Sequence, residues 1–131
     1  MPGGDVVVAG LTNGAIGGNT SPNQASLLMR LAREGDGSGA GSVVWARAYA
    51  NTTYPWFASS IDTKLGDMTI DAAGAIYVAG GFVEASSSGT SRVLKFNAAG
   101  DEDALWTPPT FNGNAVAIAL RPEGGVVVVG Y

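Results

Sequence analysis

Aromatic and polar residues gather between positions 51 and 62 of the sequence. Tyr54, Trp56 and Phe57 lie in the middle of this stretch, and Asn51 and Asp62 flank them. Aromatic rings stack on sugar rings or on aromatic side chains of a partner protein. These residues are therefore our candidate binding residues. The alternative, that Trp56 and Phe57 cap the hydrophobic core beneath the segment, stays open.

The residue types argue against most catalytic chemistry. The sequence has no cysteine and no histidine, which excludes thiol nucleophiles, disulfides, histidine-dependent triads and histidine-ligated zinc. A glycosidase needs two carboxylates at a defined separation across a cleft, and the scattered acidic residues have no spacing that imposes it. We expect residues 101–103 (Asp-Glu-Asp) to form a solvated turn rather than a calcium site. We predict no catalytic residue, metal or cofactor.

Charge and hydropathy narrow the range of partners. The formal net charge of −4 disfavours nucleic acid and anionic membranes, since both require a basic face. The longest apolar runs are far shorter than a membrane span. Residues 1–4 (Met-Pro-Gly-Gly) lack the charged and apolar regions of a signal peptide. We therefore expect neither nucleic-acid binding nor membrane insertion.

The elements that must position any site come from a repeated sequence. Residues 74–80 (GAIYVAG) recur as residues 124–130 (GGVVVVG) and as residues 4–10 (GDVVVAG). Each repeat has a glycine, a spacer, four mostly β-branched apolar residues and a second glycine, which is typical of a buried strand between two turns. Such strands are apolar on both faces when their sheet is sandwiched between two others.

The rest of the chain also reads as strands and turns. Val116, Ile118 and Leu120 alternate, as the inward face of a strand does. Trp45 and Trp106 occupy equivalent strand positions, and we expect both to pack in the core. The expected strands are residues 5–10, 27–31, 43–48, 67–70, 76–80, 92–96, a strand carrying Trp106 that ends by Thr107, 114–120 and 126–130. Gly74, Gly100 and Gly124 suit left-handed turn positions, with Asp71 and Asn97 bonding the turn backbone.

These repeats resemble a known family. Residues 69–80 (TIDAAGAIYVAG), residues 93–101 (VLKFNAAGD) and Trp106 look like the repeat of bacterial seven-bladed β-propellers (SBBP-type). Residues 117–124 (AIALRPEG) resemble the related delta-repeat propellers and, more distantly, NHL repeats. The family pattern begins the turn before the key strand with Asp. Here that position is Asp71 in one repeat, Arg121 in another and Met1 in the first.

The resemblance implies an all-β fold: a β-propeller fragment of about two to two and a half four-stranded antiparallel blades. The blades are residues 1–50 (incomplete), 66–107 (complete) and 114–131 (incomplete), which make residues 1–131 a partial propeller. The rest of the propeller is expected in a longer chain. Apolar faces built from Val6, Val8, Val126 and Val128 would lie open at the two ends. We expect the chain to self-associate through them without closing a ring.

Two functional classes follow. The long connections 11–25, 51–64, 82–91 and 108–113 should share one face of the scaffold, where binding residues concentrate. We favour a non-enzymatic binding or structural module that presents these loops to a glycan or protein partner. The alternative is a fragment of a propeller hydrolase or lyase with its catalytic residues mostly outside this chain. The resemblance implies an extracellular or cell-surface bacterial protein.

Overall fold

The computed structural model describes residues 4–12, 25–33, 41–50, 66–82 and 90–131. In these ranges every strand pairs antiparallel with its sequence neighbour, and there is no α-helix. The first sheet contains β1 (Val6–Thr12), β2 (Ala25–Leu31) and β3 (Val43–Ala50). The middle sheet contains β4 (Asp67–Ile70), β5 (Ile76–Phe82), β6 (Thr90–Phe96) and β7 (Thr110–Asn112), and the third sheet contains β8 (Ala115–Leu120) and β9 (Val126–Gly130). The all-β prediction is confirmed.

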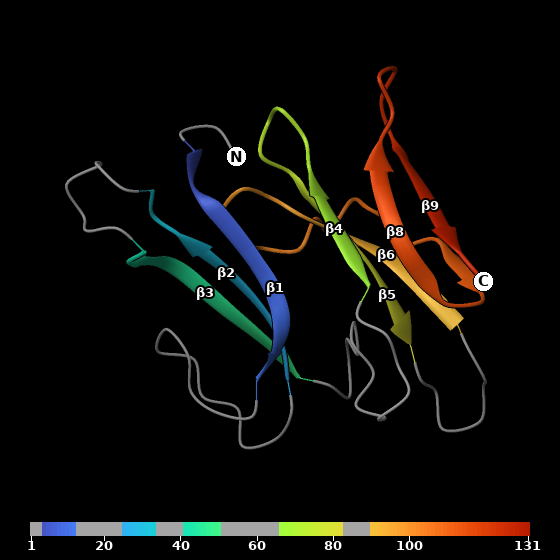
Figure 1. The fold of residues 1–131 in the computed structure, drawn as a ribbon, viewed down its shortest axis with the longest axis horizontal. Coiled ribbons are helices and arrows are strands. Elements are labelled where there is room, and N and C mark those ends of the chain that lie inside the picture. The colour runs from blue at the N-terminus through green and yellow to red at the C-terminus, as the bar shows by residue number, and fades with distance from the viewer. Residues whose placement is uncertain (1–3, 13–24, 34–40, 51–65, 83–89) are drawn as a thin grey trace.

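The three sheets stack in layers, with the β4–β7 sheet in the middle (Figure 1). On one of its faces Ile76 and Val78 pack in a cluster with Val7 of the first sheet. On the other face Tyr77 packs in a cluster with Ile118 of the third sheet. Burying one such aliphatic side chain contributes about 1.5–3 kcal/mol. The Ile-Tyr-Val-Ala run is apolar throughout because its sheet is buried on both sides.

The tight turns carry the residues expected of them. Gly74, Gly100 and Gly124 all have positive φ, at 86°, 82° and 100°. The Asp71 carboxylate accepts hydrogen bonds from the backbone N–H groups two and four residues on, at 3.0 and 2.9 Å. The Asn97 amide oxygen accepts the equivalent pair at 2.9 and 3.0 Å.

The turn at Arg121 keeps the same backbone pattern without the shared side chain. Arg121 N–H donates to Gly125 C=O at 3.0 Å, as Asp71 N–H donates to Ala75 C=O. The Arg121 guanidinium instead pairs with Glu123. The backbone of this turn therefore forms without a carboxylate at its first position.

The prediction for the fourth strand of the middle sheet was wrong. Trp106 is not in a strand, and β7 lies at Thr110–Asn112, inside the segment expected to be a loop. The strand path is interrupted. Glu102 bridges Phe96, the chain then turns at Asp103, and pairing resumes where Pro109 C=O accepts from Val93 N–H at 3.2 Å. Residues 108–109 are both proline, and proline has no N–H to donate to a ladder.

Two predictions about strand faces also fail in part. A register shift between Ala115 and Ala117 changes the alternation in β8, so Ala115 rather than Val116 is buried together with Ile118. Leu120, at the end of β8, is also exposed. In β9 the residues left open are Val127 and Val129, because Val126 and Val128 pack against the middle sheet. Val6 of β1 is 56% exposed, as expected of an open face.

Candidate functional site

The candidate binding residues named from the sequence all fall in one range that the structure does not describe. Asn51, Tyr54, Trp56, Phe57 and Asp62 lie within residues 51–65, outside the described residues. Their proposed role stays a prediction. The expected packing of the two other tryptophans can be followed: both are half-buried, and each indole N–H bonds a backbone carbonyl.

The long connections start and end at one edge of the stack. The register places the ends of β1, β2 and β3 together, with Thr12 opposite Ala25 and Ala25 opposite Ala50. In the middle sheet Thr90 lies opposite both Phe82 and Asn112. Figure 1 shows these strand ends at the lower edge of all three sheets, near the β7–β8 connection. The short turns lie at the other end.

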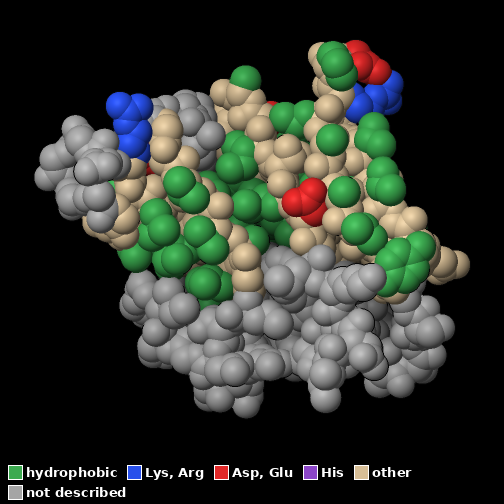
Figure 2. Space-filling model, in the orientation of Figure 1, with side chains coloured by type: hydrophobic (Ala, Val, Ile, Leu, Met, Phe, Trp, Pro, Cys, Tyr) green, Lys and Arg blue, Asp and Glu red, His purple; other side chains and the backbone are tan. Residues whose placement is uncertain are grey.

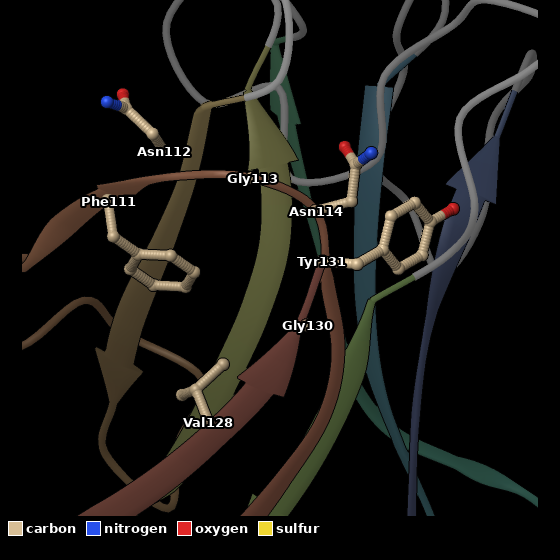
Figure 3. Close-up of a pocket in the computed structure, with 7 residues that line it drawn as sticks. All are labelled: Phe111, Asn112, Gly113, Asn114, Val128, Gly130 and Tyr131. Carbon is tan, nitrogen blue, oxygen red and sulfur yellow. The ribbon is translucent and has the colours of Figure 1, made fainter.

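A small hollow opens at this lower edge, where β7 leads into β8. Its volume is about 180 Å³, and its lining residues are Phe111, Asn112, Gly113, Asn114, Val128, Gly130 and Tyr131. In Figure 3 the Phe111 and Val128 side chains lie on one side of the hollow. The Asn114 and Tyr131 side chains lie on the other side of the backbone and extend away from Phe111 and Val128, and Asn112 also points outward.

Close backbone packing shapes the hollow. Asn114 N–H donates to Tyr131 C=O at 2.6 Å, and Tyr131 N–H donates to Asn114 C=O at 3.1 Å. Gly113 has φ +110°, and a Cβ there would lie 2.8 Å from the Tyr131 carbonyl oxygen. A Cβ on Gly130 would collide with the Asn114 carbonyl. The two glycines therefore allow these two segments to approach each other.

One buried hydroxyl fixes the floor of the hollow to the middle sheet. Ser91 of β6 is fully buried. Its Oγ donates to Gly113 C=O at 2.7 Å and accepts from Ala115 N–H at 2.9 Å. Both partners flank Asn114. The serine thus satisfies two backbone groups and sets the position of the lining segment.

The lining suits an uncharged polar ligand. The described side chains that line it provide two aromatic rings, one of them the Tyr131 phenol, and two amides, and none of these described residues is an Asp, Glu, Lys or Arg. Amides both donate and accept hydrogen bonds, as sugar hydroxyls do. Aromatic rings offer an apolar face for the carbon side of a sugar.

Ionised side chains pair elsewhere. Arg30 bonds Asp5 at 2.5 Å, Arg47 lies 3.6 Å from Asp101, and Lys95 lies 3.0 Å from Asp103. The bond from Lys95 lowers the pKa of Asp103, and the Leu105 N–H lowers it further. The same bond to Asp103 raises the pKa of Lys95. The pairs of Arg47 and Lys95 therefore involve Asp101 and Asp103, two of the three carboxylates expected to form a solvated turn.

The Asp67 carboxylate has a structural role: it accepts a hydrogen bond from Ile118 N–H at 3.0 Å and so joins β4 to β8. Within the described ranges no three acidic residues lie close enough together to form a metal site. Nor does any described helix have the length and apolarity to cross a membrane.

Comparison with protein-family models, curated proteins and solved structures found no match to this chain. The hollow and its supports therefore have to be interpreted from their own geometry.

The sequence predicts that the long connections share one edge of the stack, but it does not reveal the hollow or its support. The sequence places Phe111 and Asn112 in a connection, Asn114 at the start of the strand 114–120, and Ser91 at the end of a loop. One signal was available, an aromatic residue followed by Asn-Gly-Asn just before a strand. Nothing local marks Ser91, because its partners lie more than twenty residues away along the chain.

Proposed function

We propose that the three sheets are consecutive blades of a β-propeller and that the chain is a non-enzymatic binding and structural module. In this proposal it belongs to an extracytoplasmic bacterial propeller that presents its long connections to a glycan or protein partner. One observation carries the proposal: the middle sheet, with strands in sequence order, is buried on both faces by its neighbours. A propeller blade needs such packing.

The repeat supports this stacking residue by residue. Val7 and Tyr77 occupy the same place in their repeats, three residues after the first glycine. Each is buried, and each packs against the sheet that follows its own in the sequence. Equivalent residues thus make equivalent contacts, as blades arranged around an axis do.

The hollow favours a glycan as the ligand. Its volume of about 180 Å³ is below the roughly 300–1,000 Å³ of pockets that hold drug-sized ligands. This is room for a single ring rather than for a folded peptide segment. Phe111 offers an apolar surface, and Asn114 and Tyr131 add polar groups to the lining.

Chemical-shift mapping with a panel of neutral monosaccharides up to millimolar concentrations tests this function. We expect shifts confined to residues 111–114 and 128–131. Asn114→Ala and Tyr131→Phe should each weaken binding by about tenfold, which is about 1.4 kcal/mol. Ser91→Ala should weaken it indirectly by releasing the lining segment.

Thr107→Ala is the control, since Thr107 is exposed and does not line the hollow. It should leave the shifts unchanged. No shift with any sugar of the panel, or equal shifts in the Asn114→Ala protein, would overturn the assignment of the hollow to glycans.

A further inference from the structure

Each outer sheet has an apolar face turned away from the middle sheet. On β9, Val127 is 49% exposed and Val129 is 61% exposed. On the first sheet, Val6, Leu31 and Val43 form a row across its three strands. Val6 is 56% and Val43 is 47% exposed. Figure 2 shows hydrophobic side chains gathered over the first sheet and again along the β8–β9 hairpin.

The repeat shows what kind of face each one is. Val127 holds the place that Tyr77 holds in the middle sheet, and Val6 holds the place of Val126. Inside the chain, Tyr77 and Val126 belong to one cluster across the interface between the middle and third sheets. The open face of β9 therefore corresponds to the face of the middle sheet that contacts the third sheet. The open face of β1 corresponds to the face of the third sheet that contacts the middle sheet.

We propose that a second copy of this chain stacks head to tail on the first. Val6 and Val8 of one copy then lie against Val127 and Val129 of the other, repeating the contact between the middle and third sheets. The β9 face suits this, because Val127 is paired with Ala119 and Val129 with Ala117, which gives a flat surface of small apolar groups. The proposal rests on sheet packing, and it stands whether or not the hollow binds a sugar.

The contact joins two unlike faces, so each added copy leaves one face of each kind open. Such a heterologous interface produces open, concentration-dependent assemblies unless its rotation closes a ring. Two like faces meeting would instead give a dimer and nothing larger. The nearby charges do not oppose burial of Val6, since Asp5 and Arg30 already bond each other at 2.5 Å.

Sedimentation velocity and native mass spectrometry of the full 131-residue chain test the proposal. The wild-type protein should form a ladder of oligomers that lengthens with concentration. Val6→Lys and Val127→Lys each block one face, and each should weaken self-association by at least about tenfold. An equimolar mixture of the two variants should form a one-to-one heterodimer through the two intact faces.

Leu105→Lys is the matched control. Leu105 is 95% exposed and lies on neither face, so this variant should assemble like the wild type. Circular dichroism checks each fold, with Val43→Lys as the second variant should Val6→Lys unfold. A wild-type monomer at all concentrations overturns the proposal. Unchanged self-association of the Val127→Lys protein would also overturn the proposal, because it would indicate that the copies pair through strand edges.

Discussion

At the residue scale, the Lys95 ammonium shows how a charge is held at an interface between sheets. Lys95 Nζ lies 3.0 Å from the Asp103 carboxylate and 5.7 Å from the ring centroids of both Tyr77 and Trp106. The two rings meet edge to face at 5.8 Å. A cation over aromatic faces is attracted by the ring quadrupole. Lys95 therefore connects the packed aromatic pair to the turn at Asp103.

The pKa shifts of this pair predict a pH dependence of stability. The pKa of Asp103 is lowered, so its stabilisation is present at neutral pH and is lost as the pH falls below the ordinary value of 3.8. The pKa of Lys95 is raised, so its contribution is lost only above its ordinary value of 10.5. Asp103→Asn should therefore lower the melting temperature at pH 7.

The difference in melting temperature between the wild type and Asp103→Asn should disappear toward pH 2, where the wild-type carboxylate is protonated. Melting curves across this range measure it. Asp101→Asn is the control. Asp101 is exposed and its 3.6 Å ion pair with Arg47 is longer than the Lys95–Asp103 pair, so this variant should change the melting temperature little. A pH-independent effect of Asp103→Asn would show that the ion pair contributes nothing.

At the scale of elements, the turn at 97–101 serves as a docking point between two sheets. The Trp45 ring of β3 packs over Gly100, and its indole N–H donates to Ala98 C=O at 3.2 Å. A Cβ on Gly100 would lie 2.6 Å from the ring. The turn glycine thus does two things: it adopts a left-handed backbone, and it makes room for the tryptophan.

Gly100→Ala and Gly124→Ala separate these two roles. Both glycines have positive φ, but a Cβ on Gly124 would meet nothing within 4 Å. Gly124→Ala should cost about 1–2 kcal/mol from backbone strain alone. Gly100→Ala should cost about 1–3 kcal/mol more, because the Trp45 ring must move.

Denaturant unfolding monitored by far-UV circular dichroism measures both costs. In the Gly100→Ala protein, Trp45→Ala should remove the extra cost, which a double-mutant cycle detects. Equal costs at the two glycines would mean that the ring does not rest on this turn.

At the scale of the whole molecule, the sheets differ in how much of their apolar surface is buried. The middle sheet is covered on both faces, and Ile76, Val78 and Phe96 are almost fully buried. The β8–β9 hairpin has one covered face, and its valines are half-exposed on the other. Local opening costs least where few apolar contacts are lost.

Hydrogen exchange should follow this gradient. Among the amides bonded within sheets, those of β5 and β6 should exchange last, at a rate set by global unfolding. Those of β9 that pair with β8 should exchange first, through local opening of the hairpin. Mass spectrometry or NMR at dilute concentration measures the order. Slower exchange in β9 than in β5 would show that the third sheet is more stably packed than its open face implies.

Much of the local structure was predictable from the sequence. The glycine-bounded apolar runs predicted β5 and β9 to within a few residues, and Asp71 and Asn97 predicted the bonds that close their turns. These features depend on neighbours within about five residues. β-branched residues favour extended backbone, and glycine permits positive φ, wherever the rest of the chain lies.

Tertiary structure decided what depends on distant partners. The register shift in β8 turned Val116 outward, and the interruption at Asp103 and Pro109 moved the fourth strand away from Trp106. The hollow exists because Ser91 bonds a segment more than twenty residues away. Sequence patterning sets which residues prefer to be buried, but several packings satisfy that preference. Only the assembled sheets determine which polar groups meet, since an unpaired buried hydrogen-bonding group costs about 1–3 kcal/mol.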